Sequence, residues 1–224
     1  ESPFYEEKAI DSIISSRAKI VISVSCFIKH VKQYDALEAQ GCRLFFVERK
    51  PPGKEKYFGY DYYEAGFEIG SSMKERGYNS ISLIVGLDYY ANEIAFKKAF
   101  IAGFTAKGAD KKTVDGFSSS HMGAMSTAFD VLSEKNLPDA VVCSNEDIYR
   151  SLVEAADIIV QDDPPHIYTV SHTGNYVKDI DSHYVMNYSN LGLKCAGTIY
   201  NAMYDEMSGG EEYYDKLKPE GFLK

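Results

Sequence analysis

DYYEAGFEIGSSMKERG (61–77) decides the fold of this chain, together with the two stretches that follow it, YNSISLIVG (78–86) and ANEIAFKKAFIAGF (91–104). Asp61 followed three residues later by Glu64 is a capping-box pattern, because both side chains can bond backbone N–H groups of the first helical turn. We therefore expect a helix to begin at Asp61. The three stretches predict helix, strand and helix in succession, which is typical of a parallel α/β sheet.

The spacing of apolar residues supports this assignment. One side of the first helix is apolar or small, at Tyr62, Ala65, Ile69 and Met73. Gly77 is a typical left-handed stop for that helix. Residues 81–85 form a short apolar strand, and Asn92 is expected to cap the second helix. The inner side of the second helix carries Phe96, Ala99, Phe100, Gly103 and Phe104.

Length and charge limit the possible classes of protein. The chain has 224 residues, of which 45% are apolar, and this size favours two lobes over one. Its 33 acidic and 24 basic residues give a net charge of −9, which argues against nucleic-acid binding by its own surface. No run approaches the roughly 18 apolar residues of a membrane span, and no signal segment is visible at the N-terminus. We expect a soluble protein with no membrane contact.

The four cysteines point to a reducing compartment. Cys26, Cys42, Cys143 and Cys195 are widely scattered, form no C-x-x-C pair, and lie in or beside apolar stretches. We interpret them as reduced core thiols of a cytoplasmic protein. No metal site and no cofactor are expected.

Helices and strands alternate along the rest of the chain. Helices are predicted at 5–16, 31–37, 122–132, 145–159 and 190–207, and strands at 19–24, 43–47, 57–60, 113–117, 140–143, 166–170 and 184–186. Phe222 and Leu223 could add an edge strand. The first lobe thus has only three strands and two helices, little for a sheet that needs cover on both faces. Part of that lobe is expected to precede Glu1.

Several stretches together resemble one family. They are AKIVISVS (18–25), FFVER (45–49), GYDYYEAGFEIGSSMKERGYNSISLIVG (59–86), FIAGF (100–104), LPDAVVCSNED (137–147) and NLGLKCAGTIYNAM (190–203). In order and spacing they resemble the effector-binding domain of LacI/GalR-type transcription regulators, which share the type I periplasmic-binding-protein fold. The resemblance covers essentially the whole chain.

The resemblance implies an α/β fold with two doubly wound parallel-sheet lobes, the first lacking its opening strand, helix and strand. Residues 1–61 with 187–207 would form the N-terminal lobe, and 62–186 with 208–224 the C-terminal lobe. A small ligand would lie between the lobes and change their relative geometry. In the family a helix-turn-helix headpiece, absent from this chain, binds operator DNA.

The resemblance also implies ligand-binding positions. By place in the pattern they are Asp61, Phe100, Asn145, Glu146 and His172, or Ser171 if the alignment is one residue off. Phe100 replaces an arginine, Glu146 an aspartate and His172 an aspartate that many members have. Because phenylalanine offers a face for stacking, and Tyr89 and Tyr90 lie in the adjacent loop, the pocket would be aromatic. A sugar or nucleoside could stack there, and a sugar is the leading ligand class.

Each position also has a purely structural interpretation. Asp61 could be only an N-cap. Phe100, at helical spacing with Phe96 and Phe104, could belong to the core. Asn145 and Glu146 could simply begin a helix, and for His172 ligand contact and a structural role stay equally open.

Two functions remain, and neither is enzymatic. The chain has no G-x-G-x-x-G after a strand, no Walker loop, no G-x-S-x-G and no H-E-x-x-H, so no catalytic residue is assigned. The first function is the ligand-sensing and dimerising part of a DNA-binding regulator. The alternative is an extracytoplasmic sugar-binding protein or a receptor sensor domain of the same fold. Residues preceding Glu1 would distinguish them, while FFVER, LPDAVVCSNED and the unpaired cysteines favour the regulator, which should form a homodimer on two DNA half-sites.

Overall fold

The computed structural model describes residues 2–54, 57–106, 114–159, 164–173, 182–204 and 215–222. The chain divides into two units. Unit 1 comprises Glu1–Tyr60 with Ser189–Leu217, and unit 2 comprises Asp61–Tyr188 with Lys218–Lys224. The chain passes from one unit to the other at 60–61, 188–189 and 217–218. The sequence placed the third crossing near Ser208.

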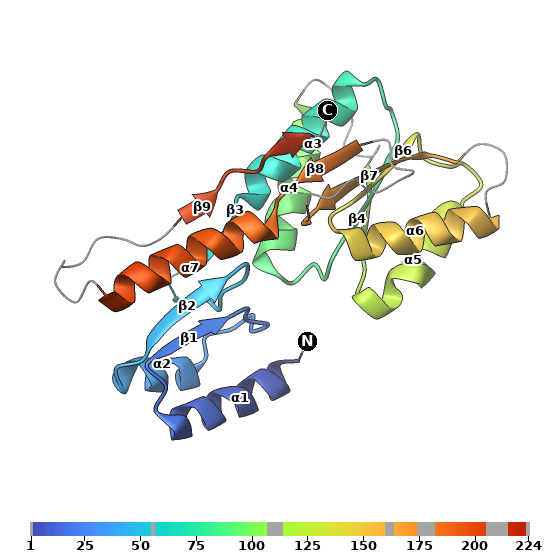
Figure 1. Ribbon diagram of the computed structural model, residues 1–224. Helices are drawn as coiled ribbons and strands as arrows, with labels where there is room; N and C mark the ends of the chain where they lie inside the picture. Colours follow the sequence, from blue (N-terminus) through green and yellow to red (C-terminus); the bar gives the residue numbers. More distant parts are fainter. Residues whose placement is uncertain are drawn as a thin grey trace. The chain divides into compact units, whose positions relative to one another are not determined.

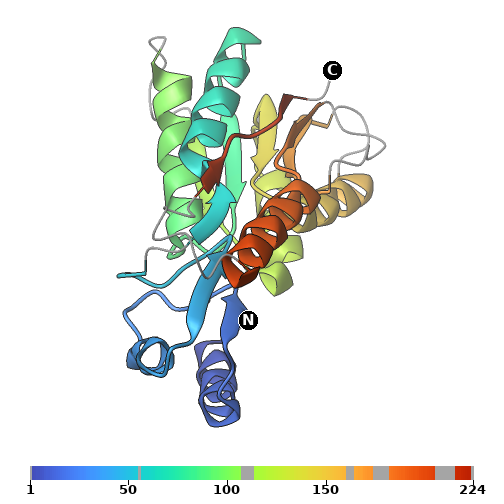
Figure 2. The same ribbon diagram turned by 60° about the vertical axis from the view of Figure 1, so that its left-hand side comes forward.

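Unit 1 is a parallel sheet with helices on both faces. Its strands are β1 (Ile20–Ser23), β2 (Arg43–Val47), β3 (Tyr57–Tyr60) and β9 (Asp215–Leu217), in the order β1-β2-β3-β9. Its helices are α1 (Pro3–Ser16), α2 (Lys32–Ala39) and α7 (Tyr188–Tyr204), which begins in the last residue of unit 2. Figures 1 and 2 show α1 and α2 on one side of this sheet and α7 on the other.

Strand β9 corrects the predicted lobe assignment. Phe58 of β3 pairs in parallel with Asp215, so β9 belongs to the sheet of unit 1. The sequence assigned all of 208–224 to the second lobe, which is wrong for these three residues. The predicted end of the last helix at 207 lies outside the described residues, which follow α7 to Tyr204.

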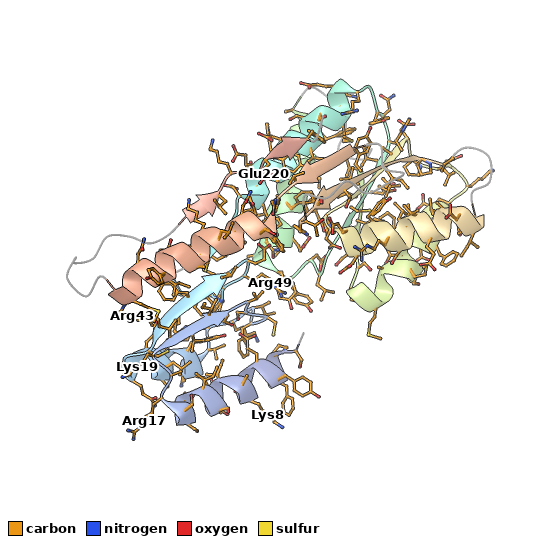
Figure 3. All side chains as sticks on the ribbon, in the orientation of Figure 1. Lys8, Arg17, Lys19, Arg43, Arg49 and Glu220 are labelled. Carbon is orange, nitrogen blue, oxygen red and sulfur yellow. The ribbon has the colours of Figure 1, made fainter. Side chains whose placement is uncertain are left out.

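Basic side chains gather at one end of unit 1. Arg17 follows the last residue of α1, Lys19 precedes β1, and Arg43 begins β2. All three are exposed, and Figure 3 shows them at the end of the unit where these strands start. Since ligands of parallel α/β sheets bind at the opposite, carboxyl edge, this cluster lies away from the expected binding edge.

Unit 2 has a larger sheet. Its strands are β4 (Ile81–Val85), β5 (Val114–Ser118), β6 (Ala140–Cys143), β7 (His166–Ser171), β8 (Ser182–Val185) and β10 (Gly221–Phe222), in the order β10-β8-β7-β6-β4-β5. Every neighbouring pair is parallel except β10 with β8. The helices α3 (Tyr62–Glu75) and α4 (Ala91–Thr105) cover one face, and α5 (Ala124–Leu132) and α6 (Glu146–Ile159) the other (Figures 1 and 2).

The start of α3 confirms the predicted cap. Asp61 Oδ1 accepts hydrogen bonds from the backbone N–H groups of Tyr63 (3.0 Å) and Glu64 (3.1 Å). Gly77 has a φ of +91°, as a left-handed helix stop requires. The predicted cap of α4 is wrong, because Asn92 is the second residue of that helix and Tyr90 is its N-cap, with no side-chain bond.

Glycines let α3 and α4 pack backbone against backbone. A Cβ atom at Gly70 would lie 2.2 Å from the carbonyl oxygen of Phe100, and one at Gly66 would lie 2.4 Å from that of Phe96. A Cβ atom at Gly103 of α4 would lie 2.2 Å from the carbonyl oxygen of Phe67. Only glycine permits such an approach, so these residues set the distance between the two helices.

The opposite face of the sheet is sealed by apolar side chains of α5 and α6. Val131, Leu152 and Ala155 are fully buried there and pack in one cluster with Val141 of β6. Met122 stands at helical spacing with Met125, but it is 95% exposed because a short 3-10 turn, His121–Gly123, precedes α5. Among the described residues, no helix is long and apolar enough to span a membrane.

Candidate functional site

Polar segments follow the parallel strands of unit 2 at one edge of the sheet. They are residues 86–90 after β4, 119–120 after β5, 144–147 after β6, 171–173 at the end of β7 and 186–188 after β8. The carboxyl ends of parallel strands share one edge, and open α/β sheets bind their ligands there. We call these segments, with 61–64 at the start of α3, the carboxyl edge.

Glu146 is the centre of the carboxyl edge. Its Oε1 accepts hydrogen bonds from the hydroxyls of Ser171 (2.6 Å) and Thr173 (3.0 Å), although Glu146 is only 9% exposed and Ser171 fully buried. Burial acts to raise the pKa of Glu146, but the bonds from Ser171 and Thr173 outweigh it, and the pKa is lowered. Glu146 is therefore a buried carboxylate that is ionised at neutral pH.

His172 is neutral and has an unused ring nitrogen. Its ring stacks on that of Tyr188, with centroids 4.2 Å apart and planes at 25°. Nε2 is buried and makes no hydrogen bond to any described residue. Burial lowers the pKa of His172 to about 4, although the charges of Glu146 and Asp147 act in the opposite direction. A neutral imidazole with a free nitrogen can donate to, or accept from, a ligand hydroxyl.

Two tyrosines connect His172 to the first residues of α3. The Tyr188 hydroxyl lies 3.1 Å from the hydroxyl of Tyr62, and the Tyr188 backbone N–H donates to the carbonyl oxygen of His172 (2.8 Å). Tyr62 is the residue after Asp61. The structure thus links His172 to the residue that follows Asp61, through two tyrosines that the sequence did not assign to the site.

The loop after β4 is held by serine hydroxyls. The backbone N–H of Gly86 donates to Ser144 Oγ (3.1 Å) and to Glu93 Oε2 (3.0 Å). Ser118 Oγ donates to the carbonyl oxygen of Gly86 (3.0 Å). This fixes the base of the loop that carries Tyr89 and Tyr90, whose ring centroids are 4.7 Å apart. Tyr89 is 48% exposed and so offers a face to a ligand.

Asn145 and Phe100 have structural roles. Asn145 Oδ1 accepts the backbone N–H of Ile148 (3.1 Å), which is an N-cap of α6. Phe100 is fully buried, and its ring stacks on that of Phe104 between α4 and its neighbours. A fully buried ring has no face to offer, so we leave Phe100 out of the proposed site. The core interpretation that the sequence left open fits its position.

The sequence missed Thr173, Tyr62 and Tyr188. Ser171 and Thr173 flank His172 directly after an apolar strand, and such a polar triplet at a strand end was a visible signal. The tyrosine pair had no such signal, because its contact depends on tertiary structure. In the part of the chain that the structure describes, no group of three or more His, Cys, Asp or Glu side chains is arranged to hold a metal ion.

Comparison with known proteins identifies the fold. No family profile and no curated protein sequence matches this chain. Among solved structures, the Cra transcriptional dual regulator from Pseudomonas putida in complex with fructose 1-phosphate is similar, with 12% identity, 100% of this chain and 83% of that chain covered, and a TM-score of 0.83.

Two further solved structures with this fold are named as a transporter and as a periplasmic binding protein/LacI transcriptional regulator. A sugar transporter from Clostridium phytofermentans has 12% identity, coverage of 100% and 82%, and a TM-score of 0.82. A periplasmic binding protein/LacI transcriptional regulator from Alkaliphilus metalliredigens, complexed with D-xylulofuranose, has 14% identity, coverage of 98% and 81%, and a TM-score of 0.76. The chain therefore has the α/β fold shared by LacI-type effector-binding domains and type I periplasmic binding proteins, as the sequence predicted.

Proposed function

We propose that this chain is the ligand-sensing and dimerising domain of a LacI-type DNA-binding transcription regulator, and that it binds a small sugar-like effector. The observation that carries the proposal is the constellation of Glu146, Ser171, His172, Thr173 and Tyr188 at the carboxyl edge of unit 2. It combines an ionised carboxylate, a neutral imidazole and an aromatic ring, which suit the hydroxyls and the apolar face of a sugar. The solved proteins of the same fold are named as a transcriptional regulator, a sugar transporter and a periplasmic binding protein/LacI transcriptional regulator, and no catalytic role is proposed.

Asp61, Tyr89, Tyr90, Asn145, Glu146 and His172 are the proposed ligand-binding residues. The location of the ligand between two lobes stays a prediction of the family resemblance. The charge of −9 on these 224 residues opposes contact with phosphates, so operator DNA would be bound through a headpiece outside them.

Dimerisation and location in the cytoplasm are proposed on separate grounds. Large apolar side chains that a partner subunit could cover are exposed on α1 and α7: Phe4, Tyr5, Leu193 and Tyr200. The four cysteines are free and buried, as the sequence predicted, which suits a reducing compartment.

The alternative is a sugar-binding protein outside the cytoplasm, which the names of two similar structures favour. Light scattering separates the two functions. A regulator is expected to be dimeric at micromolar concentration, and a strictly monomeric protein would favour the alternative.

Ligand binding itself is tested by a thermal-shift screen of the 224-residue chain against free sugars, sugar phosphates and nucleosides. A bound ligand raises the melting temperature by mass action. The shift should be lost in His172→Ala and kept in Glu154→Gln, an exposed position of α6. No shift with any of these compounds would refute the proposed effector class.

A further inference from the structure

We infer that the effector is an unphosphorylated sugar or amino sugar, and that the carboxyl edge of unit 2 discriminates against phosphorylated ligands. The inference rests on the proposed function and narrows its ligand class.

The carboxyl edge is acidic. Its described segments contain Asp61, Glu64, Asp88, Glu146 and Asp147, and no lysine or arginine. Lys218 lies near Glu64, at 3.5 Å, but its side chain is 85% exposed and contributes little. Among the described residues of this edge, a phosphate would meet like charges and no basic partner other than the exposed Lys218.

Glu146 is the strongest part of this negative field. It is buried, its pKa is lowered, and it forms no ion pair with any described residue. The hydroxyls of Ser171 and Thr173 stabilise its charge without cancelling it. Because a charge in a buried site is poorly screened, an approaching phosphate would be repelled strongly.

Helix N-termini often bind anions, but those of α3 and α6 already hold acidic or amide groups. The N-cap of α4, Tyr90, makes no side-chain capping bond, and the acidic residue Glu93 lies in the first turn of that helix. Asp61 accepts the free N–H groups of Tyr63 and Glu64 at the start of α3. At the start of α6, Asn145 accepts the N–H of Ile148. Glu146 and Asp147 occupy the first turn of α6 and offset its positive end.

The groups that remain suit a polyol. Nε2 of His172 is buried without a partner among the described residues, and this independent observation marks a position for a ligand atom. A sugar hydroxyl could donate to Glu146 or bond to Nε2, and an ammonium group could pair with Glu146.

Matched ligand pairs test the inference. Melting temperatures of the 224-residue chain at low salt would be compared for fructose and fructose 1-phosphate, ribose and ribose 5-phosphate, and glucose, glucosamine and glucose 6-phosphate. We expect at least one free or amino sugar to raise the melting temperature. The corresponding sugar phosphate should bind at least about tenfold more weakly. A phosphate that binds as well as its free sugar would overturn the inference but leave the proposed function standing. Failure of every compound would overturn both.

Glu146→Gln tests whether the negative charge of Glu146 discriminates against phosphorylated ligands. Loss of this charge should weaken binding of the free sugar about tenfold or more. The difference in affinity between the free sugar and its phosphorylated form should become smaller. Glu154→Gln removes the same charge from an exposed position of the same helix and should change neither affinity. Circular dichroism would confirm that both variants fold. An unchanged ratio of the two affinities in Glu146→Gln would overturn the inference.

Discussion

The hydroxyls of Tyr62 and Tyr188 lie 3.1 Å apart, although 126 residues separate them in the sequence. Tyr62 is the second residue after the chain enters unit 2, and Tyr188 is the last before it leaves. The Tyr188 ring also stacks on His172. Tyr62 and Tyr188 lie beside two of the points where the chain passes between the units, and Tyr188 also contacts His172. A ligand that binds His172 could therefore affect the backbone at both points through Tyr188.

A double-mutant cycle should reveal this contact. Tyr62→Phe and Tyr188→Phe keep both rings and the stacking on His172 but remove one hydroxyl each. Each variant is expected to lose about 1 kcal/mol of unfolding free energy. The double variant should lose much less than the sum, because both substitutions remove the same bond. Denaturant unfolding measures the three variants, and strictly additive losses would show that the hydroxyls do not interact.

Stability should depend on pH through His172. Its pKa of about 4 lies below the value of 6.5 usual for histidine, so the unfolded chain binds a proton more readily. The folded state is thus fully favoured above pH 6.5 and loses stability as pH falls towards 4, by about 2–3 kcal/mol for this one group. His172→Phe, which keeps an aromatic ring against Tyr188, should be less sensitive over this range.

The comparison is made by urea unfolding of both proteins at pH 7 and pH 4.5. Other groups titrate equally in the wild type and in His172→Phe. The difference between the pH dependences of their unfolding free energies therefore reports on His172 alone. Parallel losses in both proteins would mean that the ring titrates normally and is not desolvated.

Much of the fold could be predicted because its signals are local. The cap at Asp61 and the stop at Gly77 depend on neighbouring backbone groups, and both were found. Four strands, at 43–47, 57–60, 81–85 and 140–143, have the predicted bounds. They are short apolar runs between polar turns, and buried parallel strands have this pattern.

What escaped prediction depends on distant partners. The strand β9 reads Asp-Lys-Leu and has no apolar run, and it forms only because β3, more than 150 residues earlier, offers an open edge. Met122 matched the helical spacing of Met125, but a tighter turn before α5 rotates it into solvent. Spacing alone does not reveal where a helix changes its pitch.

The candidate site was predicted in part and for similar reasons. Glu146 and His172 followed from the family resemblance, which places polar residues after strands. Their bonding partners Thr173 and Tyr188 could not be read from spacing. The helical spacing of Phe100 fits a core residue and a pocket residue equally, so the sequence could not assign it to either. Its burial follows from the glycines that bring α3 against α4.

The close packing of α3 and α4 predicts a strong effect at Gly70. In Gly70→Ala the new Cβ would lie 2.2 Å from the Phe100 carbonyl oxygen, so the helices must separate. We expect a loss of about 1–3 kcal/mol, or more, in unfolding free energy. Gly197→Ala makes the same change on α7, where nothing lies within 4 Å, and should stabilise by about 0.5–1 kcal/mol. Similar melting temperatures for the two variants would mean that α3 and α4 are not in backbone contact.

The four thiols should be inert in the folded protein. Each is at most 6% exposed, and burial raises the pKa of Cys26 to about 11 and raises those of Cys42, Cys143 and Cys195. At Cys26 the Glu6 carboxylate raises the pKa further, because its Oε2 accepts a hydrogen bond from the thiol, with Sγ and Oε2 2.8 Å apart. The thiolate is the reactive form, so Ellman's reagent should label none of the four within minutes at pH 8 and all four in denaturant. Of the four, Cys26 should respond to Glu6→Gln by becoming more reactive, since this removes the charge that holds its proton. Rapid labelling of the native wild-type protein would contradict the burial of these thiols.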